Sequence, residues 1–150
     1  MKIVRASFDS LEALIPLFDQ YRQFYGQAED LKGARAFLLE RLGKRDSVVY
    51  MAFTTPGNEA LGFIQLYPSF SSVAMKPLWI LNDLFVTKIG RRQGVAEKLI
   101  RQAEKHARDT QARGLVLETA IDNSPARRLY EKLGWSMEDG FLTYRIDFKE

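Results

Sequence analysis

A strand, a basic loop and a helix that follow one another in the second half of the chain constrain its fold most strongly. Residues 78–86 show the clearest strand pattern, and residues 87–94 lead from them into a helical pattern that starts at Val95. Residues 114–120 are strand-like again. Because a helix between two strands usually acts as a crossover, this order predicts that the two strands are parallel.

The first half of the chain predicts a strand, two helices and an antiparallel hairpin. Apolar spacing places the first strand at 2–6, the first helix from Leu11 to a stop at Gly26, and the second helix at 30–42. The hairpin strands are expected at 47–54 and 60–67, joined by a turn that contains Pro and Gly. A Ser-rich loop over 68–77 is expected to follow.

The chain is predicted to close with a helix and two strands. Ser124 and Pro125 are typical of a helix start, and this helix is expected to end near Gly134. Strands are expected near 135–138 and 141–148. The chain of 150 residues falls within the size range of one domain. We therefore expect a single α/β domain over residues 1–150, with a central mixed, mostly antiparallel sheet flanked by helices.

The composition excludes several kinds of site. Cysteine is absent, which excludes disulfides and thiolate nucleophiles, and the single histidine, His106, cannot supply a Ser-His-Asp triad or a His-based metal site. We therefore expect no metal. The N-terminus lacks the pattern of a signal peptide, and no apolar run approaches the length of a membrane span. The sequence thus predicts a cytoplasmic protein with no membrane partner.

The charge balance is mildly basic. Lys and Arg number 22 against 19 Asp and Glu, which gives a net charge of +3, and the sequence pI is near 9.2. This excess fits an anionic small ligand as well as it fits nucleic acid. Because the basic residues alternate with acids along the predicted helices and form no single stripe, we expect no nucleic-acid partner.

The loop between the 78–86 strand and the following helix has the composition of a phosphate site. Residues 91–96 read Arg-Arg-Gln-Gly-Val-Ala and end in the first helical turn. A helix N-terminus offers unpaired backbone N–H groups and a partial positive charge, and Gly94 leaves them accessible. Arg91 and Arg92 add donors suited to phosphate oxygens. The loop matches neither a Walker A nor a dinucleotide motif, so it predicts a pyrophosphate cradle of another kind.

Two motifs in the right order resemble those of the GCN5-related N-acetyltransferases. The first is Leu-Asn-Asp-Leu-Phe-Val at 81–86, followed by Arg91-x-x-Gly94-x-Ala96. The second is the Asn-x-x-Ala-x-x-x-Tyr segment at 123–130, which ends in Leu-Gly-Trp at 133–135. The resemblance covers residues 78–135 and implies the fold of that family, in which a parallel pair of strands splays apart at the cofactor site.

The resemblance implies that acetyl-CoA is the acetyl donor. In that family the central strand pairs with the pantetheine arm as if the cofactor were a further strand, the basic loop holds the pyrophosphate, and the asparagine bonds the pantetheine. Carried onto this sequence, the cofactor residues are Leu84, Phe85, Val86, Arg91, Arg92, Gln93, Gly94, Val95, Ala96, Asn123 and Ala126.

The resemblance also implies catalytic roles. Tyr130 matches the tyrosine that protonates the departing CoA thiolate. An amine acceptor, with a pKa of about 10.4, must lose a proton before it attacks. Asp83 and, after it, Glu118 are the acidic candidates for this step, and strand alternation predicts that Asn82 and Asp83 face opposite ways. In relatives that acetylate polyamines an acid stands at the position of Asn82, so this chain departs from them.

The function that follows is acetyl-CoA-dependent N-acetyl transfer, directly to a primary amine of a small molecule. Two alternatives stay open: acetylation of a protein or peptide at lysine or the N-terminus, and a non-catalytic CoA-binding sensor. Many relatives are dimers, and the C-terminal strand offers an edge for pairing, so the sequence is compatible with a homodimer.

Overall fold

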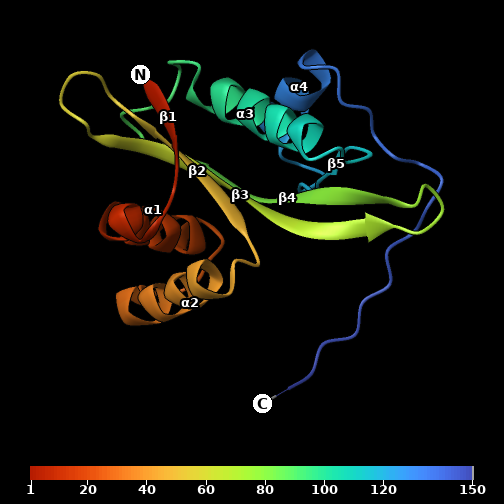
Figure 1. Cartoon of the computed structure of the whole chain (residues 1–150), viewed down its shortest axis with the longest axis horizontal. Coiled ribbons are helices and arrows are strands. Elements are labelled where there is room, and N and C mark those ends of the chain that lie inside the picture. The colour runs from red at the N-terminus through yellow and green to blue at the C-terminus, as the bar shows by residue number, and fades with distance from the viewer. Residues whose placement is uncertain (150) are drawn as a thin grey trace. The chain divides into compact units, whose positions relative to one another are not determined.

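A five-stranded sheet in the order β1-β2-β3-β4-β5 organises residues 1–118 (Figure 1). The computed structural model describes residues 1–149 and divides into two units, Met1–Glu118 and Thr119–Glu150. The strands of the first unit are β1 (Lys2–Arg5), β2 (Val48–Phe53), β3 (Ala60–Ser71), β4 (Lys76–Val86) and β5 (Leu115–Val116). Its helices are the 3-10 turn η1 (Phe8–Ser10), α1 (Leu11–Phe24), α2 (Leu31–Lys44) and α3 (Val95–Asp109).

The topology of the sheet confirms the predicted fold class. Neighbouring strands from β1 to β4 are antiparallel. The pair β4 and β5 is parallel and is connected through α3, with Trp79 opposite Leu115 and Ile80 opposite Val116. The crossover that the strand–loop–helix order predicted is therefore present, in a mixed and mostly antiparallel sheet.

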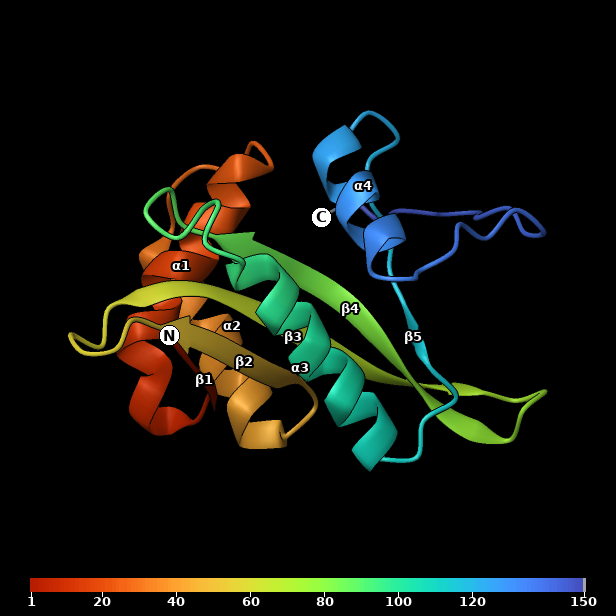
Figure 2. The same ribbon diagram turned by 90° about the horizontal axis from the view of Figure 1, so that it is seen from above.

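The helices of this unit cover both faces of the sheet. Helices α1 and α2 lie on one face and α3 lies on the other (Figures 1 and 2). On the first face Leu14, Leu38 and Phe63 pack in one cluster and are at most 1% exposed. On the second face α3 buries Leu99 and Ile100 completely. Neither face of the central strands is left to solvent, so all of β2 and residues 61–66 of β3 are buried.

The hairpin formed by β3 and β4 is longer than the sequence predicted. The pairing continues from Tyr67 opposite Ile80 to Ser71 opposite Lys76, which leaves only 72–75 as a turn, so the predicted loop over 68–77 is wrong. Pro68 lies within this extension although it has no N–H to donate. Proline is tolerated there because β2 begins at Val48, opposite Leu66. No residue of β2 therefore lies beside Pro68 to accept a hydrogen bond from its backbone nitrogen.

Strand β5 is shorter than predicted, with two residues in place of 114–120. Its pairing with β4 stops at Ile80. Two residues further along, a register shift between Gln65 and Leu66 of β3 leaves Asn82 of β4 without an opposite residue. This is a β-bulge, and a bulge bends the strand that contains it. The parallel pair therefore ends where β4 changes direction.

The second unit contains one helix, α4 (Ser124–Lys132), among its described residues. Asn123 caps it by accepting a hydrogen bond at Oδ1 from the N–H of Ala126, at 3.3 Å. Gly134 follows its end with φ of +96°, as the predicted stop requires. The predicted strands at 135–138 and 141–148 are not formed, because residues 136–149 find no backbone hydrogen-bond partner among residues 1–149 and a strand exists only when it is paired.

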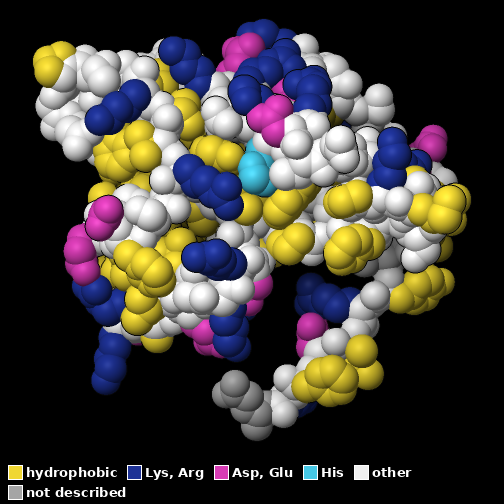
Figure 3. All heavy atoms as spheres, in the orientation of Figure 1, with side chains coloured by type: hydrophobic (Ala, Val, Ile, Leu, Met, Phe, Trp, Pro, Cys, Tyr) yellow, Lys and Arg dark blue, Asp and Glu magenta, His cyan; other side chains and the backbone are white. Residues whose placement is uncertain are grey.

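No helix within residues 1–149 is both long enough and apolar enough to cross a membrane. Lys and Arg side chains are spread over the face seen in Figure 3, with Asp and Glu between them.

Candidate functional site

The loop before α3 has the backbone geometry of an anion cradle. Gly94 is the N-cap of α3 and has φ of +75°, and Arg92 is also left-handed, with φ of +62°. No side chain caps the first turn of α3, so its N–H groups are not taken up by a capping oxygen. A Cβ at Gly94 would meet no atom within 4 Å, so the space in front of these groups is open. This geometry fits a phosphate group.

Neighbouring contacts hold this loop in place. The Gln93 side chain donates from Nε2 to the carbonyl of Ile89 at 2.5 Å. Thr87 donates its N–H to the carbonyl of Leu61 at 2.8 Å and accepts at Oγ1 from the N–H of Gly90. Val95 is 1% exposed, so its side chain belongs to the core and only its backbone can reach a ligand. A ligand would meet the loop mainly through backbone N–H groups and the two arginines.

One edge of β4 is free beside this loop. Leu84, Phe85 and Val86 pair with β3 on one side. On the other side β4 pairs with β5 only at Trp79 and Ile80, so no strand among the described residues pairs with that edge at 84–86. An extended ligand with amide groups, such as a pantetheine arm, could pair with this edge as a strand does.

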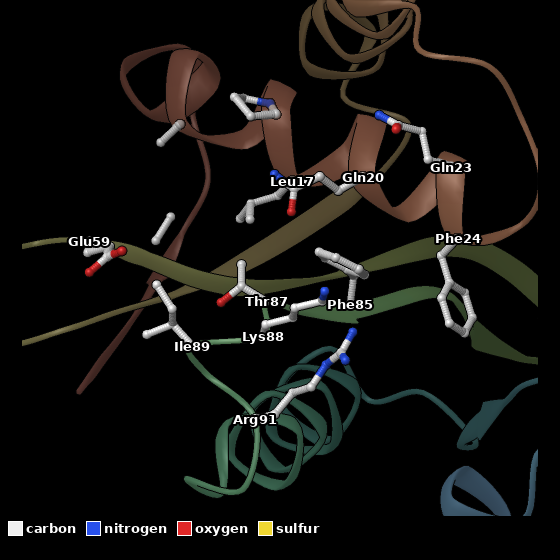
Figure 4. Close-up of a pocket in the computed structure, with 13 residues that line it drawn as sticks. Leu17, Gln20, Gln23, Phe24, Glu59, Phe85, Thr87, Lys88, Ile89 and Arg91 are labelled. Atoms are coloured by element: carbon white, nitrogen blue, oxygen red, sulfur yellow. The ribbon is translucent and has the colours of Figure 1, made fainter.

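A cavity of about 740 Å³ lies between α1 and the loop after β4 (Figure 4). Its apolar wall includes Leu17, Phe24 and Phe85, and its polar groups include Lys88 and Arg91. Figure 4 shows the side chains of Lys88 and Arg91 extending toward the side of the cavity on which Phe85 lies. The cavity thus adjoins the cradle and the free edge of β4, and its volume is typical of a small-molecule site.

Asp83 is the centre of a buried hydrogen-bond network in the same strand. It is 3% exposed, and Gln65 of β3 donates from Nε2 to its Oδ2 at 2.5 Å. Asn82 donates from Nδ2 to its Oδ1 at 3.0 Å, and the Tyr21 hydroxyl donates to the carbonyl of Asn82 at 3.3 Å. Strict alternation would separate the side chains of Asn82 and Asp83, but the bulge at Asn82 brings them together.

Burial controls the protonation of this network. It raises the pKa of the Asp83 carboxyl, while hydrogen bonds from Gln65, Tyr21 and Asn82 act in the opposite direction and are outweighed. Burial, together with the nearby Asp83, also raises the pKa of the Tyr21 hydroxyl, and it raises that of Tyr67 to about 12. The two phenols therefore stay neutral near pH 7, and Asp83 is the carboxyl of the network, with its pKa above the usual range.

The other predicted residues lie outside this network. Glu118 follows the short β5, is exposed and takes no part in the hydrogen bonds around Asp83. In the second unit, Asn123 uses its Oδ1 to cap α4. Tyr130 on α4 is half-buried and packs near Trp135, with ring centroids 5.6 Å apart. Within residues 1–149 no three His, Asp or Glu side chains gather in a way that could hold a metal ion.

Gln65 is the residue of the network that the sequence analysis missed. Its signal is one polar side chain inside the apolar run Leu-Gly-Phe-Ile-Gln-Leu at 61–66. A polar group in a strand that is buried on both faces needs a partner, and here the partner is Asp83. Gly62 is a second missed position, because a Cβ there would lie 2.6 Å from the carbonyl oxygen of Phe85.

The sequence of this chain is similar to those of known acetyltransferases. The model of the acetyltransferase (GNAT) family matches residues 13–135. The chain is 45% identical over 147 residues to the uncharacterized N-acetyltransferase YhfO of Bacillus subtilis (strain 168), covering 98% of this chain and 97% of that protein. It is 36% identical over 142 residues to a probable acetyltransferase of Haemophilus influenzae, covering 87% of this chain and 97% of that protein.

A solved structure is similar over the whole chain. The crystal structure of a probable acetyltransferase superposes with a TM-score of 0.95 at 41% identity and covers 100% of this chain and 99% of its own. This likeness confirms the fold class that the sequence predicted.

Proposed function

This chain belongs to the acetyltransferase (GNAT) family, and we propose that residues 1–150 act as one acetyl-CoA-dependent N-acetyltransferase domain whose acceptor is the primary amine of a small molecule. The observation that carries the proposal is the adjacency of three features: the cradle before α3, the free edge of β4 at 84–86 and the cavity of about 740 Å³ that Phe85 and Arg91 line. Location in the cytoplasm stays a prediction.

The cradle and the strand edge together suit the two polar parts of acetyl-CoA. The N–H groups of residues 94–96 and the side chains of Arg91 and Arg92 would hold the pyrophosphate. The backbone of Leu84, Phe85 and Val86 would pair with the pantetheine. We assign Asn123 and Ala126 of the second unit to the pantetheine as well, on the family motif. Acetyl-CoA supplies the acetyl group and a thiol as its leaving group.

Asp83 is the group we propose to remove the proton from the acceptor. An ammonium with a pKa of about 10.4 is mostly charged at neutral pH, so a proton must leave before the nitrogen can attack. A carboxylate with a raised pKa is a better proton acceptor than an ordinary one, and Asp83 is hydrogen-bonded to the exposed side chain of Asn82. We favour Asp83 over Glu118 because Glu118 is exposed and outside the network.

Tyr130 is the residue we propose to return a proton to the thiolate as it leaves. A thiol with a pKa of about 8.5 is a fair leaving group, so this donor adds modestly to the rate, and correct placement of amine and thioester contributes more. Asp83 passes the first proton of the ammonium to solvent. The nitrogen loses a second proton as the C–N bond forms and the C–S bond breaks, and this proton replaces the one that Tyr130 gives to the thiolate, so the transfer releases one proton overall.

The size of the cavity favours a small acceptor. Its volume falls within the roughly 300–1,000 Å³ that is typical of small-molecule sites. A peptide acceptor would instead need a groove that accommodates an extended chain on both sides of its amine.

The test is thiol release from acetyl-CoA with a panel of amino sugars, polyamines and simple primary amines, beside peptides that present a lysine or a free N-terminus. We expect thiol release that requires one class of small amine, with the acetylated product found by mass spectrometry. Turnover with peptides alone would move the acceptor to proteins. Acetyl-CoA binding without turnover on any amine would instead support the sensor.

A further inference from the structure

The two oxygens of the Asp83 carboxyl have different partners. Oδ2 accepts a hydrogen bond from Nε2 of Gln65 at 2.5 Å, and Oδ1 accepts one from Nδ2 of Asn82 at 3.0 Å. Gln65 is completely buried, whereas Asn82 is exposed. A carboxylate can take up a proton at either oxygen, so the surroundings of each oxygen decide which one does.

The backbone holds Gln65 opposite Asp83. The two residues are partners in the register of β3 against β4, and side chains directly opposite one another on antiparallel strands lie on the same face of the sheet. The register shift that forms the bulge comes directly after Gln65. All of residues 61–66 are buried, so the Gln65 side chain has little freedom to leave Oδ2 of Asp83.

The carboxylate fixes the orientation of the Gln65 amide. Nε2 lies toward Oδ2 of Asp83, and Oε1 is buried and accepts no hydrogen bond from residues 1–149. A half turn of the amide would place Oε1 against Oδ2, and neither atom of that pair could donate to the other. An unpaired buried acceptor is unfavourable, so this orientation is kept for the bond that Nε2 makes.

The groups around Asp83 come from three elements: Tyr21 of α1, Gln65 and Tyr67 of β3, and Asn82 of β4. Tyr21 and Tyr67 have raised pKa values, so both phenols are neutral near pH 7. Arg41 and Asp46 lie near Tyr67 and shift its pKa in opposite directions. The hydrogen bonds to Asp83 therefore favour the charged carboxylate against the effect of burial.

We propose that Gln65 is a positioning residue: it holds Oδ2 of Asp83, so that Oδ1 is the oxygen that takes up the proton of the acceptor amine. This inference rests on the proposed acetyl transfer. The N–H bond of the ammonium breaks, its electron pair stays on nitrogen, and the proton forms an O–H bond at Oδ1, from which it later passes to solvent.

The two hydrogen bonds to Asp83 then have different roles during proton uptake. Asn82 gives up its bond to Oδ1 as the proton arrives, which its exposed side chain allows. Gln65 keeps its bond to Oδ2, because its amide is buried and oriented before the proton arrives. A positioned acceptor atom loses less freedom in the reaction than a carboxylate that turns, so the bond from Gln65 favours the transfer.

The first measurement is the pKa of Asp83 without acceptor, read from the NMR signal of its side-chain carboxyl carbon during a pH titration. Gln65→Met keeps the length of the side chain and removes the donor, so the midpoint should rise by about 1 to 2 pH units. Gln65→Leu should show the same rise. The matched control is Ile64→Met, because Ile64 is fully buried beside Gln65 on the opposite face of β3, and it should leave the midpoint unchanged.

The second measurement is the dependence of kcat on pH, with an amine that the wild type acetylates. The acid limb of Gln65→Met should move to higher pH together with the pKa of Asp83. On the plateau above that limb, kcat should stay at least about 10-fold below that of the wild type, because Oδ2 is no longer held. A role of Gln65 in packing alone would move neither the acid limb nor the pKa.

Two results would overturn the proposal and leave acetyl transfer in place: a pKa of Asp83 that Gln65→Met does not change, or a plateau kcat equal to that of the wild type. Absence of turnover by the wild type with every amine would overturn the proposed function, and with it the role of Gln65 in proton uptake. The rise in the pKa of Asp83 would then describe only the buried carboxyl.

Discussion

Asp83 and His106 are both buried titratable side chains of the first unit, 3% and 8% exposed, and they lie in different surroundings. Burial shifts each pKa toward the neutral form: it raises that of Asp83 and lowers that of His106. Asp83 bonds to the exposed Asn82 at a bulge beside the free edge of β4. His106 of α3 contacts the buried Tyr50 and the half-buried Trp79 instead.

The surroundings of His106 are those of a core residue. Its Nδ1 is 2.8 Å from the hydroxyl of the buried Tyr50, and its ring packs edge-on to Trp79 at 4.7 Å. The comparison teaches that burial and a shifted pKa do not by themselves identify a catalytic group. Asp83 differs from His106 in its hydrogen bond to the exposed Asn82, which links it to solvent. We therefore assign a catalytic role to Asp83 and a packing role to His106.

The largest expected effect is that of Asp83→Asn on turnover. Loss of a positioned proton acceptor typically costs about 10²–10⁴ in rate, so kcat/KM should fall by at least 100-fold. The melting temperature should hold or rise, because the variant removes a charge whose burial is unfavourable. Steady-state thiol release and thermal melting check both outcomes. A variant that retains most of its kcat/KM would show that another group accepts the proton.

His106→Leu should have the opposite effects: it should lower the unfolding free energy and leave turnover unchanged. The substitution leaves the buried Tyr50 hydroxyl without its partner, which costs about 1–3 kcal/mol. Urea denaturation measures this loss. The double variant Tyr50→Phe with His106→Leu removes both polar groups. Its loss of unfolding free energy should therefore be smaller than the sum of the losses of the two single variants. A strong fall in kcat for His106→Leu at a temperature where it stays folded would contradict the assignment.

Tyr21→Phe should have a smaller effect on turnover. It removes one hydrogen bond to the carbonyl of Asn82, worth about 1 kcal/mol, so kcat should fall several-fold. Because the hydroxyl also lowers the pKa of Asp83, its loss should move the acid limb of the kcat profile to higher pH. The pH profiles of the wild type and the variant decide this. A fall in kcat with an unmoved acid limb would assign Tyr21 to packing alone.

The smallest expected effect is that of pH on stability through His106. Its pKa is lowered in the folded chain, so the neutral ring contributes stability above the unfolded pKa of about 6.5, and that contribution is lost as the pH falls through the folded value. The difference in unfolding free energy between the wild type and His106→Leu should therefore shrink from pH 7 to pH 5. Urea titrations at both pH values measure it, and a constant difference would contradict the buried neutral ring.

The sequence predicted the part of the site that is built from residues adjacent in the chain. The strand at 78–86, the loop with Gly94 and the helix from Val95 follow one another directly, so periodicity and one glycine suffice to place them. The family resemblance, drawn from those residues and from 123–130, is confirmed by the match over residues 13–135.

The parts that the sequence predicted poorly depend on distant partners. The bulge at Asn82 exists only in the register of β4 against β3, so alternation alone missed the contact between Asn82 and Asp83. Gln65 gains its role only from the carboxylate opposite it. The strand predicted at 141–148 is not formed, because a strand needs a neighbour and residues 1–149 of one chain supply none.

The most direct test of the account is thermal melting with and without acetyl-CoA, for the wild type and for Gly94→Glu. At 100 times its Kd, acetyl-CoA should stabilise the wild type by about 2.7 kcal/mol. Gly94→Glu should lose this gain, because its carboxylate would occupy the open cradle, while Gly43→Glu, at an exposed position of α2, should keep it. No stabilisation of the wild type, or equal stabilisation of Gly94→Glu, would contradict the cradle as the acetyl-CoA site.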